Sequence, residues 1–351
     1  MKILLTGGTG FVGSYLVARL IKDGHEVTIL IRSGEEARGA SPGVSFLEGD
    51  PTRRGPWQEA IRDHDAVINL AGASIFTKWT AEQKRAILES RVSTTRNIVE
   101  GIKADEGKSF TLFSTSAVGY YGFHGDEELT EDSPPGNDFL ATVAVAWEGE
   151  ALKAQEKGAR VVITRFGIVM GANGGALGQM IPLFKKFIGG PIGSGSQWFS
   201  WVHAADLTEA FVFLLKHPEV SGPVNVCSPS PVRNRDLARA LGKALHRPSF
   251  VAAPGFMIKL VLGEFGSVIL KGQRVLPRRL LDAGFVFQYP EIDKAGQFGM
   301  LIREDLAVLF LSGPDSYRLC RTDQCNRPRS AQILGSLRTI IDEDGDGSLT
   351  P

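Results

Sequence analysis

The sequence has little of what marks secreted, membrane-embedded or nucleic-acid-coating proteins. Its 351 residues include three cysteines, too few for a disulfide framework, which favours a reducing compartment. No apolar run reaches the ~18 residues that a membrane helix needs. The first residues, MKILLTG, lack the anatomy of a signal peptide. Because 39 basic residues balance 39 acidic ones, a nucleic-acid binder is disfavoured. We expect a cytoplasmic protein with neither nucleic-acid nor membrane partners.

The composition is that of an ordinary globular protein. Apolar residues make up 43% and charged residues 22% of the chain, and glycine supplies 41 positions. At ~150 residues per domain, the length predicts two domains or one large α/β domain with an appendage.

Short apolar runs alternate with longer helical patterns over the first half of the chain. Near-continuous apolar strands separated by helices indicate a parallel sheet covered on both faces, and right-handed crossovers make such a sheet doubly wound. The expected strands are Ile3–Leu5, Val27–Ile31, Val44–Leu47, Ala66–Leu70, Phe110–Phe113, Val161–Thr164 and Val224–Cys227. The expected helices are Phe11–Lys22, Ala81–Lys103, Phe139–Lys157, Leu177–Ile188, Ala204–Lys216 and Arg235–Leu245.

A glycine motif lies between the first expected strand and the first expected helix. The segment TGGTGFVG places Gly7, Gly10 and Gly13 in a Gly-x-x-Gly-x-x-Gly pattern. Such glycines let the chain turn tightly and bring backbone amides to a pyrophosphate at a helix N-terminus. A glycine-rich turn without a ligand is the alternative, and the flanking strand and helix disfavour it.

The end of the second expected strand indicates which dinucleotide is bound. An NAD site usually has an acidic residue here for the ribose 2′-hydroxyl. Arg32 stands there instead, and its guanidinium suits a 2′-phosphate, so we predict NADP; the alternative is a solvated surface arginine. Small residues at Asn69–Gly72 follow the fourth strand, where the cofactor passes close to the backbone. Gly49–Asp50 either meets the adenine edge or forms a turn.

Several motifs, taken in order, carry a resemblance to a known family. They are TGGTGFVG, NLAGASI, SRVSTT, STSAVGYYG, WEGEA, RFGIVMGANGGALG, GGPIGSGSQWFSWVHAAD, PVRNRDLARALGKALHRP and GQRVLPRRLLDAGF. Over residues 1–296 the chain resembles the epimerase-like, atypical branch of the extended short-chain dehydrogenase/reductases. Members are labelled NAD-dependent epimerase/dehydratase, putative NADP-dependent oxidoreductase or, in some cases, cell-division inhibitor.

The resemblance implies a domain organisation and a set of cofactor contacts. It implies an NADP-binding Rossmann domain over residues 1–170, completed by about 201–228, and a smaller substrate lobe from 171–200 and 229–296. Residues 297–351 form an extension that it does not cover. For Arg91 a surface salt bridge is an equal alternative to a cofactor contact. The expected contacts are Gly7, Thr9, Gly10, Phe11, Val12, Gly13, Arg32, Leu70, Ala71, Gly72, Arg91, Ser114, Gly167, Ile168 and Val169.

The superfamily's catalytic Tyr-x-x-x-Lys pair is absent. In that pair the phenol moves a proton, the lysine lowers the pKa of the phenol, and a serine orients the substrate oxygen. The equivalents here are Val143 and Trp147, which cannot move a proton. None of the five tyrosines has a lysine four residues later: Tyr15, Tyr120, Tyr121, Tyr289 and Tyr317 precede Arg19, His124, Gly125, Asp293 and Arg321.

Other residues near the expected site offer acid–base groups. Ser116 matches the superfamily's active-site serine, and with Tyr120 and Tyr121 it forms the predicted catalytic set. The alternative is that the tyrosines only line the pocket and that His124 belongs to a loop. Glu148 is either a proton carrier or, as we expect, an exposed carboxylate on a helix.

The stretch from residue 193 to residue 206 joins the lobe to the sheet. The turn Gly193–Gln197 either holds a polar substrate through its amides or forms a hairpin. We expect structural roles for His203 and Asp206. The stretch also contains Trp198 and Trp201.

The C-terminal extension ends in an acidic segment. Asp342, Asp344 and Asp346, followed by Gly347 and Leu349, match the first eight positions of a calcium loop, whose twelfth-position ligand is missing. We therefore expect a solvated end and no metal site. Cys320 and Cys325 lack partners at zinc spacing, and a chance pair, a redox pair and an interface feature remain alternatives.

Three functions fit the sequence. The first is an NADP-dependent oxidoreductase or epimerase acting on a polar small molecule such as a nucleotide sugar, with atypical catalytic residues. The second is a non-catalytic NADP-binding sensor, and the third is a partner-binding regulator. A homodimer is an alternative to a monomer. The missing Tyr–Lys pair separates the first function from the other two, whereas Ser116 favours a pocket that still receives a substrate.

Overall fold

The computed structural model describes residues 1–32, 43–103, 109–171 and 174–292. The expectations for Cys320, Cys325 and the acidic end concern residues outside this part of the chain.

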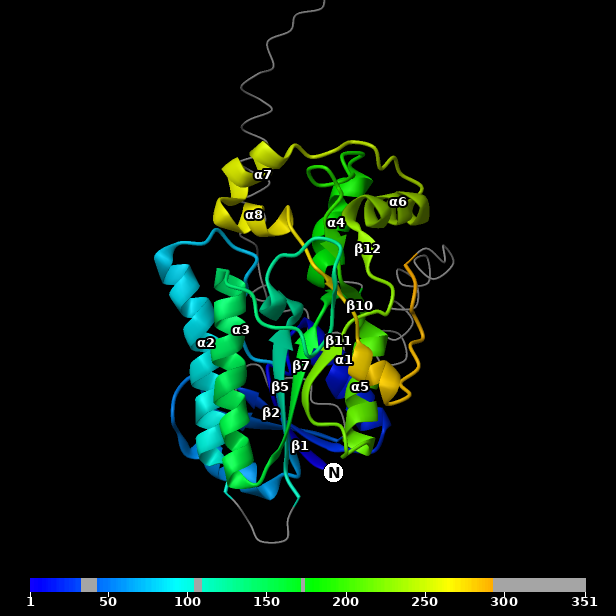
Figure 1. Cartoon of the computed structure of the whole chain (residues 1–351). Coiled ribbons are helices and arrows are strands. Elements are labelled where there is room, and N and C mark those ends of the chain that lie inside the picture. Colours follow the sequence, from blue (N-terminus) through cyan, green and yellow to red (C-terminus); the bar gives the residue numbers. More distant parts are fainter. Residues whose placement is uncertain (33–42, 104–108, 172–173, 293–351) are drawn as a thin grey trace, which may run out of the picture.

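Seven parallel strands form the central sheet, in the order β11-β7-β5-β4-β1-β2-β3 (Figure 1). The chain proceeds from β1 toward one edge of the sheet and, after β3, crosses to β4 and continues toward the other edge. This topology confirms the predicted doubly wound Rossmann fold. The strands are β1 (Lys2–Thr6), β2 (Glu26–Ile31), β3 (Val44–Glu48), β4 (Ala66–Asn69), β5 (Thr111–Ala117), β7 (Arg160–Phe166) and β11 (Gly222–Val226).

Helices cover both faces of this sheet because its strands are apolar on both sides. Leu5 is buried beneath one helical layer with Leu16 and Leu207, whereas the neighbouring Leu4 is buried beneath the other with Ile98. The first layer contains α1 (Phe11–Lys22) and α5 (Ala204–Lys216). The second contains the 3-10 helix η2 (Pro56–Asp63), α2 (Ala81–Gly101), α3 (Phe139–Leu152) and the 3-10 helix η4 (Lys153–Lys157).

Local capping explains where the second-layer helices begin and end. The Thr80 hydroxyl accepts a hydrogen bond from the Gln83 amide at the start of α2, and Asp138 caps α3 in the same way. The predicted helix Phe139–Lys157 is divided into α3 and η4, and it ends at Gly158 in the left-handed conformation, with φ of 76°.

A smaller lobe lies over the carboxyl ends of the strands (Figure 1). Its core joins Leu177 and Phe184 of α4 to Leu237 and Leu241 of α6, and Trp201 is buried in the same cluster. Its helices are α4 (Gly175–Lys185), α6 (Asn234–Leu245), α7 (Gly255–Leu262) and α8 (Glu264–Ile269). The remaining elements are the 3-10 helix η3 (Val118–Tyr121), α9 (Arg278–Asp282), β6 (Glu128–Leu129), β8 (Ile168–Met170), β9 (Trp198–Phe199), β10 (Trp201–His203), β12 (Val232–Arg233) and β13 (Arg274–Val275).

Candidate active site

The glycine motif forms a cradle between β1 and α1. Gly7 has φ of +71°, which favours glycine, and a Cβ there would lie 2.9 Å from the carbonyl carbon of Leu70. A Cβ on Gly13 would lie 2.2 Å from the Gly7 carbonyl oxygen. The cradle therefore admits no side chains at these positions. No described side chain caps the start of α1 at Gly10, so the amides at this helix end are available to an anion.

The other expected residues of this loop lie around the cradle. Thr9 and Gly10 are exposed, and Val12 packs against the core beneath α1. Phe11 reaches the glycine-rich segment before α4, where a Cβ on Gly174 would lie 2.2 Å from its ring. The start of α1 is therefore packed directly against the smaller lobe.

Arg32 follows β2 directly and is exposed. Asp50 lies near enough to interact with it electrostatically, but Asp50 also accepts hydrogen bonds from the amide and hydroxyl of Thr52 at 2.9 and 2.7 Å. Burial opposes ionisation of Asp50, yet these bonds and the nearby arginines lower its pKa. The Gly49–Asp50 segment thus forms the turn that was one of the two predicted alternatives.

A buried asparagine fixes the carboxyl ends of β1 and β4. The side-chain oxygen of Asn69 accepts hydrogen bonds from the Thr6 hydroxyl, at 2.7 Å, and from the Ala71 amide, at 3.3 Å. Its side-chain nitrogen donates to the Thr95 hydroxyl of α2 at 2.9 Å. The backbone of Leu70–Gly72 is thereby held next to the glycine cradle. From the sequence, this stretch is predicted only to place small residues next to the cofactor. The hydrogen bonds by which Asn69 joins β1, β4 and α2 were not predicted.

Arg91 lies behind the end of β4 and makes no salt bridge to any described residue. Its Nη1 donates to the carbonyls of Ala73 and Ile87, both at 3.0 Å. A Cβ on Gly72 would lie 3.0 Å from the Arg91 Cζ, so the guanidinium is in contact with this backbone. Burial lowers the pKa of Arg91 to about 10, which leaves it cationic at neutral pH. The predicted salt-bridge alternative for Arg91 is wrong.

Ser116, at the carboxyl end of β5, belongs to a buried ionic network. Its hydroxyl donates to Glu148 at 2.6 Å, and Arg165 of β7 donates to the same carboxylate through Nε at 2.8 Å and Nη2 at 2.7 Å. Glu148 is 6% exposed, so the expected exposed carboxylate was wrong. Ser114, two residues earlier on the same strand, is also buried, and its hydroxyl has no partner among the described residues.

Arg165 was missed as a site residue, although the sequence carried a signal for it. A charged residue interrupts an apolar strand, and such a residue is buried only with a partner. Its Nη1 also donates to the Tyr121 hydroxyl at 2.9 Å. The network continues from Tyr121 to the side-chain oxygen of Asn225 at 2.7 Å.

The two adjacent tyrosines differ in accessibility. Tyr121 is fully buried, its hydroxyl bonds both Arg165 and Asn225, and burial raises its pKa well above the usual value. This placement argues against Tyr121 as a proton carrier. Tyr120 is half-buried, and its ring centre lies 3.5 Å from the guanidinium carbon of Arg165. His124 contacts Glu127 and the Tyr121 carbonyl, which agrees with a place in a loop.

The helix positions that match the Tyr–Lys pair contribute packing. Val143 is buried in an apolar cluster with Trp79, Ile87 and Phe265. Trp147 is 5% exposed, and its indole nitrogen donates to the Thr95 hydroxyl at 2.9 Å. Neither side chain has a titratable proton, as the sequence already indicated.

The loop after β7 connects the sheet to the smaller lobe. The Gly167 amide donates to the Val226 carbonyl at 3.0 Å, and a Cβ on Gly167 would lie 3.0 Å from the Cβ of Cys227. Ile168 is 36% exposed, and Val169 follows it in β8, which pairs with β10. The loop therefore presents Ile168 to solvent while its backbone is anchored on both sides.

The start of α5 is anchored to the segment that follows α9. Both carboxylate oxygens of Asp206 accept backbone amides, from Gln288 at 2.7 Å and from Tyr289 at 2.9 Å. His203 caps α5 by accepting the Ala205 amide, and its ring centre lies 3.9 Å from that of Tyr289, with the two rings tilted by 49°. These contacts agree with the structural roles expected for both residues.

Three amides of the turn Gly193–Gln197 donate hydrogen bonds to other groups of the protein. Gly193 donates to the Ala253 carbonyl, Gly195 donates to the Ile192 carbonyl, and Ser196 donates to the Ser194 hydroxyl. With φ of +60° at Gly193 and +65° at Gly195, the segment is a glycine-dependent turn. This favours the hairpin alternative over a substrate clasp.

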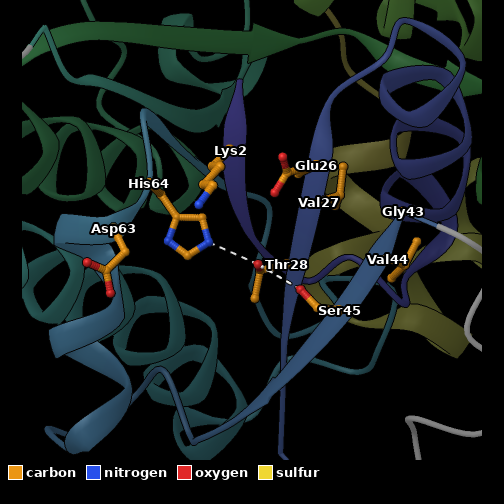
Figure 2. A pocket seen from close by; sticks show the side chains of 9 residues that line it. All are labelled: Lys2, Glu26, Val27, Thr28, Gly43, Val44, Ser45, Asp63 and His64. Carbon is orange, nitrogen blue, oxygen red and sulfur yellow. Dashed lines mark hydrogen bonds between the residues drawn. The ribbon is translucent and has the colours of Figure 1, made fainter.

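A separate hollow at the amino edge of the sheet lies away from these residues (Figure 2). Its lining includes Thr28, which bonds His64 Nε2 at 2.9 Å and the Ser45 hydroxyl at 3.0 Å. His64 Nδ1 contacts the Ala60 carbonyl at 2.7 Å. The polar groups thus bond one another and tie η2 to β2 and β3.

The described residues hold neither a cluster of metal-ligating side chains nor a membrane-spanning helix. No three of their His, Cys, Asp and Glu side chains are placed to hold a metal ion. Within the same part of the chain, no helix has the length and apolar character needed to cross a membrane.

Comparison with known proteins agrees with this geometry. The sequence model of the NAD dependent epimerase/dehydratase family matches residues 3–227, and that of a domain of unknown function, DUF1731, matches residues 253–297. An Arabidopsis thaliana protein named epimerase family protein SDR39U1 homolog, chloroplastic, is 42% identical over 297 residues, which are 84% of this chain and 85% of that protein. The epimerase family protein YfhF of Bacillus subtilis is 38% identical over 296 residues, 84% of this chain and 96% of YfhF.

A solved structure supports the same assignment. The human epimerase family protein SDR39U1, isoform 2, was crystallised with NADPH; it is 32% identical to this chain, with a TM-score of 0.74 over 85% of this chain and 99% of the human one. The glycine cradle and the open start of α1 fit the pyrophosphate of such a dinucleotide. The chain belongs to the NAD dependent epimerase/dehydratase family, as a nicotinamide-dinucleotide-binding, atypical member of the extended short-chain dehydrogenase/reductases.

Proposed function

We propose that this protein is an NADP(H)-dependent oxidoreductase or epimerase acting on a polar small molecule, with Ser116 and Tyr120 as its catalytic residues. The observation that carries the proposal is the Ser116–Glu148–Arg165 network. It fixes the Ser116 hydroxyl at the carboxyl end of β5. In the sheet, only β4 separates β5 from β1, the strand that leads into the glycine cradle. In doubly wound sheets ligands bind at this edge.

NADP is the proposed cofactor because of Arg32. It directly follows β2, where the ribose of the adenosine half lies in such folds, and no acidic residue stands in its place. A guanidinium forms charge-assisted bonds to a phosphate. The NADPH in the human relative supports this choice. When bound, the nicotinamide supplies the hydride acceptor or donor.

Ser116 is proposed to orient the substrate by accepting a hydrogen bond from a substrate hydroxyl other than the one whose proton Tyr120 exchanges. Its own proton is donated to Glu148, so its lone pairs remain for a substrate hydroxyl. Glu148 already accepts one bond from Ser116 and two from Arg165. It therefore positions the serine and does not itself receive a proton from the substrate.

Tyr120 is proposed to move the proton. It is the more accessible of the two tyrosines beside Ser116, and Arg165 beneath its ring holds its orientation through a cation–π contact. A proton passing between the Tyr120 hydroxyl and the substrate oxygen would accompany hydride transfer. No described lysine contacts this phenol to assist the step, so we expect slower turnover than in enzymes with the Tyr–Lys pair.

A non-catalytic NADP-binding sensor is the second candidate, and one observation favours it. Val143 and Trp147 fill the Tyr–Lys positions with buried, apolar packing. A protein that does not catalyse proton transfer can tolerate the replacement of the Tyr–Lys pair by these two residues. The structure contributes no observation to the third possibility, a partner-binding regulator.

Turnover measurements separate the two candidates. The parent protein, Ser116→Ala and Tyr120→Phe are assayed for NADPH oxidation with a panel of aldehydes and nucleotide sugars, and any co-purified ligand is identified by mass spectrometry. Catalysis requires turnover by the parent and a loss of about 10²- to 10⁴-fold in either variant. Tight NADP binding without turnover on any substrate supports the sensor.

A further inference from the structure

We propose that the outer end of the smaller lobe is a docking surface for an anionic lipid bilayer. Exposed apolar side chains lie there among lysines and arginines, and α7 occupies the end of the lobe that points away from the sheet (Figure 1). Clustered apolar exposure of this kind marks an interaction site, whereas single exposed apolar residues need no explanation. The apolar patch consists of Phe187, Ile188, Phe250, Val251, Phe256 and Leu260.

Direct contacts join the two segments of the patch that lie outside α7. The guanidinium carbon of Arg247 lies 4.7 Å from the centre of the Phe187 ring. A Cβ on Gly190 would lie 2.0 Å from the Val251 carbonyl oxygen, so the two backbones are in contact there. The segment that follows α4 and the segment that follows α6 therefore form one surface.

Helix α7 adds projecting side chains to this surface. A Cβ on Gly255, its first residue, would lie 3.9 Å from the Cα of Gly193, and no residue of the helix is buried. Phe256 and Leu260 are four residues apart, so they share one helix face, and they are 73% and 75% exposed. The walls of a groove would shield such side chains from solvent. Projecting side chains instead suit a bilayer, whose headgroup region can receive them.

The charge of this lobe is strongly unbalanced, although the whole chain has a formal net charge of zero. Residues 174–203 and 229–275 contain ten lysines and arginines but only two carboxylates, those of Asp236 and Glu264. Both carboxylates already form ion pairs, with an arginine of α6 at 3.2 Å and with a lysine of α2 at 2.6 Å. The surplus of positive charge attracts an anionic partner.

Four of these cations lie beside the apolar patch. Lys185 and Lys186 directly precede Phe187, Lys259 belongs to α7, and Arg247 contacts the Phe187 ring. All four side chains are exposed, and no described carboxylate lies within ion-pair distance of them. Their like charges oppose a second copy of the chain as the partner, whereas anionic headgroups would pair with them.

Apolar insertion and charge attraction together favour binding at a membrane surface. Basic residues next to aromatic and aliphatic side chains are typical of proteins that lie at the boundary between headgroups and acyl chains. The expectation of no membrane partner came from the absence of long apolar runs in the sequence. Binding at a surface does not require such a run, so that expectation does not bear on this patch.

Cosedimentation of the full chain with vesicles tests the inference. One set of vesicles contains equal parts of phosphatidylcholine and phosphatidylglycerol, and the other contains phosphatidylcholine alone. The parent should bind the anionic vesicles at least about tenfold more tightly than the neutral ones, and added salt should weaken this binding because the cations are exposed. No binding to the anionic vesicles, or equal binding to both sets, overturns the inference.

The apolar contribution is tested with two equally exposed residues. Phe250→Ser removes an apolar side chain of the patch, and the matched control is Val286→Ser, because both residues are 82% exposed. Val286 follows Phe285, which packs against Phe213 of α5, so it lies outside the patch. Phe250→Ser should weaken binding to the anionic vesicles by about 10- to 100-fold, and Val286→Ser should leave it unchanged. Equal effects of the two substitutions contradict the proposal.

The charge contribution is tested with two pairs of exposed lysines. Lys185→Gln combined with Lys186→Gln should weaken binding to the anionic vesicles by about 10- to 30-fold. The matched control combines Lys22→Gln, at the end of α1, with Lys103→Gln, beyond the end of α2, and should bind as the parent does. Because all the substituted side chains are exposed, the variants should keep the fold of the parent. The same loss in both double variants would show that the lobe has no special part in binding.

Two further measurements address other partners. Sedimentation velocity without lipid compares the parent with Phe256→Ser. An unchanged oligomeric state supports the lipid assignment, whereas a dimer that Phe256→Ser abolishes would assign the patch to self-association and overturn it. Binding to poly-glutamate without binding to the anionic vesicles would assign the surface to an acidic protein and would also overturn the proposal.

Discussion

Ser116 and Glu148 are joined by a 2.6 Å hydrogen bond across the space between β5 and α3, with both side chains almost fully buried. In this bond the Ser116 hydroxyl is the donor and the Glu148 carboxylate is the acceptor. Arg165 completes the arrangement and itself contacts both tyrosines of η3. The proposed chemistry therefore depends on a charge pair that is also part of the protein's core.

Replacing Glu148 with glutamine should lower both stability and turnover. Arg165 would remain buried without its counter-charge, and breaking such a pair costs about 3–5 kcal/mol. Urea unfolding measures the loss. The matched control is Glu100→Gln, whose partner Arg54 is exposed, and it should cost less than about 1 kcal/mol. Equal effects of the two substitutions would contradict the structural role of Glu148.

Substituting phenylalanine at the two tyrosines should separate chemistry from stability. Tyr121→Phe removes the hydroxyl that accepts from Arg165 Nη1 and donates to the side-chain oxygen of Asn225, so the free energy of unfolding should fall by about 1–3 kcal/mol. Tyr120→Phe should leave stability nearly unchanged and reduce turnover by about 10²- to 10⁴-fold. Denaturation and NADPH oxidation are measured on both variants. If Tyr121→Phe remained stable but lost turnover, Tyr121 rather than Tyr120 would be the catalytic tyrosine.

Arg32 should determine the choice of dinucleotide. A charge-assisted contact to the 2′-phosphate contributes about 1.5–3 kcal/mol, so the parent should bind NADP roughly 10- to 100-fold more tightly than NAD. Arg32→Ala should remove this preference and leave NAD affinity unchanged. Calorimetry with both dinucleotides checks the prediction, which fails if the preference survives the substitution.

The pH dependence of stability should reveal the opposed titrations of His203 and Asp206. Burial lowers the pKa of His203 to about 4, so between pH 4 and 6.5 the unfolded chain binds more protons there and stability rises with pH. Burial raises the pKa of Asp206 to about 6, despite the two amides it accepts, so between pH 3.8 and 6 stability falls with pH. The two contributions nearly cancel.

His203→Asn should expose this cancellation, because asparagine still caps the helix. From pH 4 to 6.5, the stability of the variant relative to the parent should fall by about 3 kcal/mol, at 1.36 kcal/mol per pKa unit. Denaturant titrations at each pH provide the measurement. Parallel stability curves for the two proteins would show that His203 does not titrate as described.

Deleting residues 298–351 should leave dinucleotide affinity unchanged. The two family models together end at residue 297, and the glycine cradle and Arg91 lie in the first third of the chain. Calorimetry on the shortened and full chains compares them directly. Loss of NADP binding on deletion would place these residues in the binding domain.

The pattern of residues within single segments of the sequence was sufficient to predict the fold and the glycine cradle. The predicted bounds of the helices Phe11–Lys22 and Ala204–Lys216 match α1 and α5, because their apolar spacing and flanking residues are read within one segment. Gly7 and Gly13 were likewise identified from their spacing, because both belong to one short, continuous segment of the chain. The parallel sheet followed from apolar strands that alternate with helices.

Only the tertiary structure decided what the polar side chains do. Glu148 lies on an apolar helix that contains no cation to pair with it; its role depends on Arg165, which the parallel register of β5 and β7 places beside Ser116. Tyr120 and Tyr121 are adjacent in sequence, yet only the second is enclosed. Such pairings join residues from different elements, and their energies depend on burial and distance, which no pattern within one segment of the sequence contains.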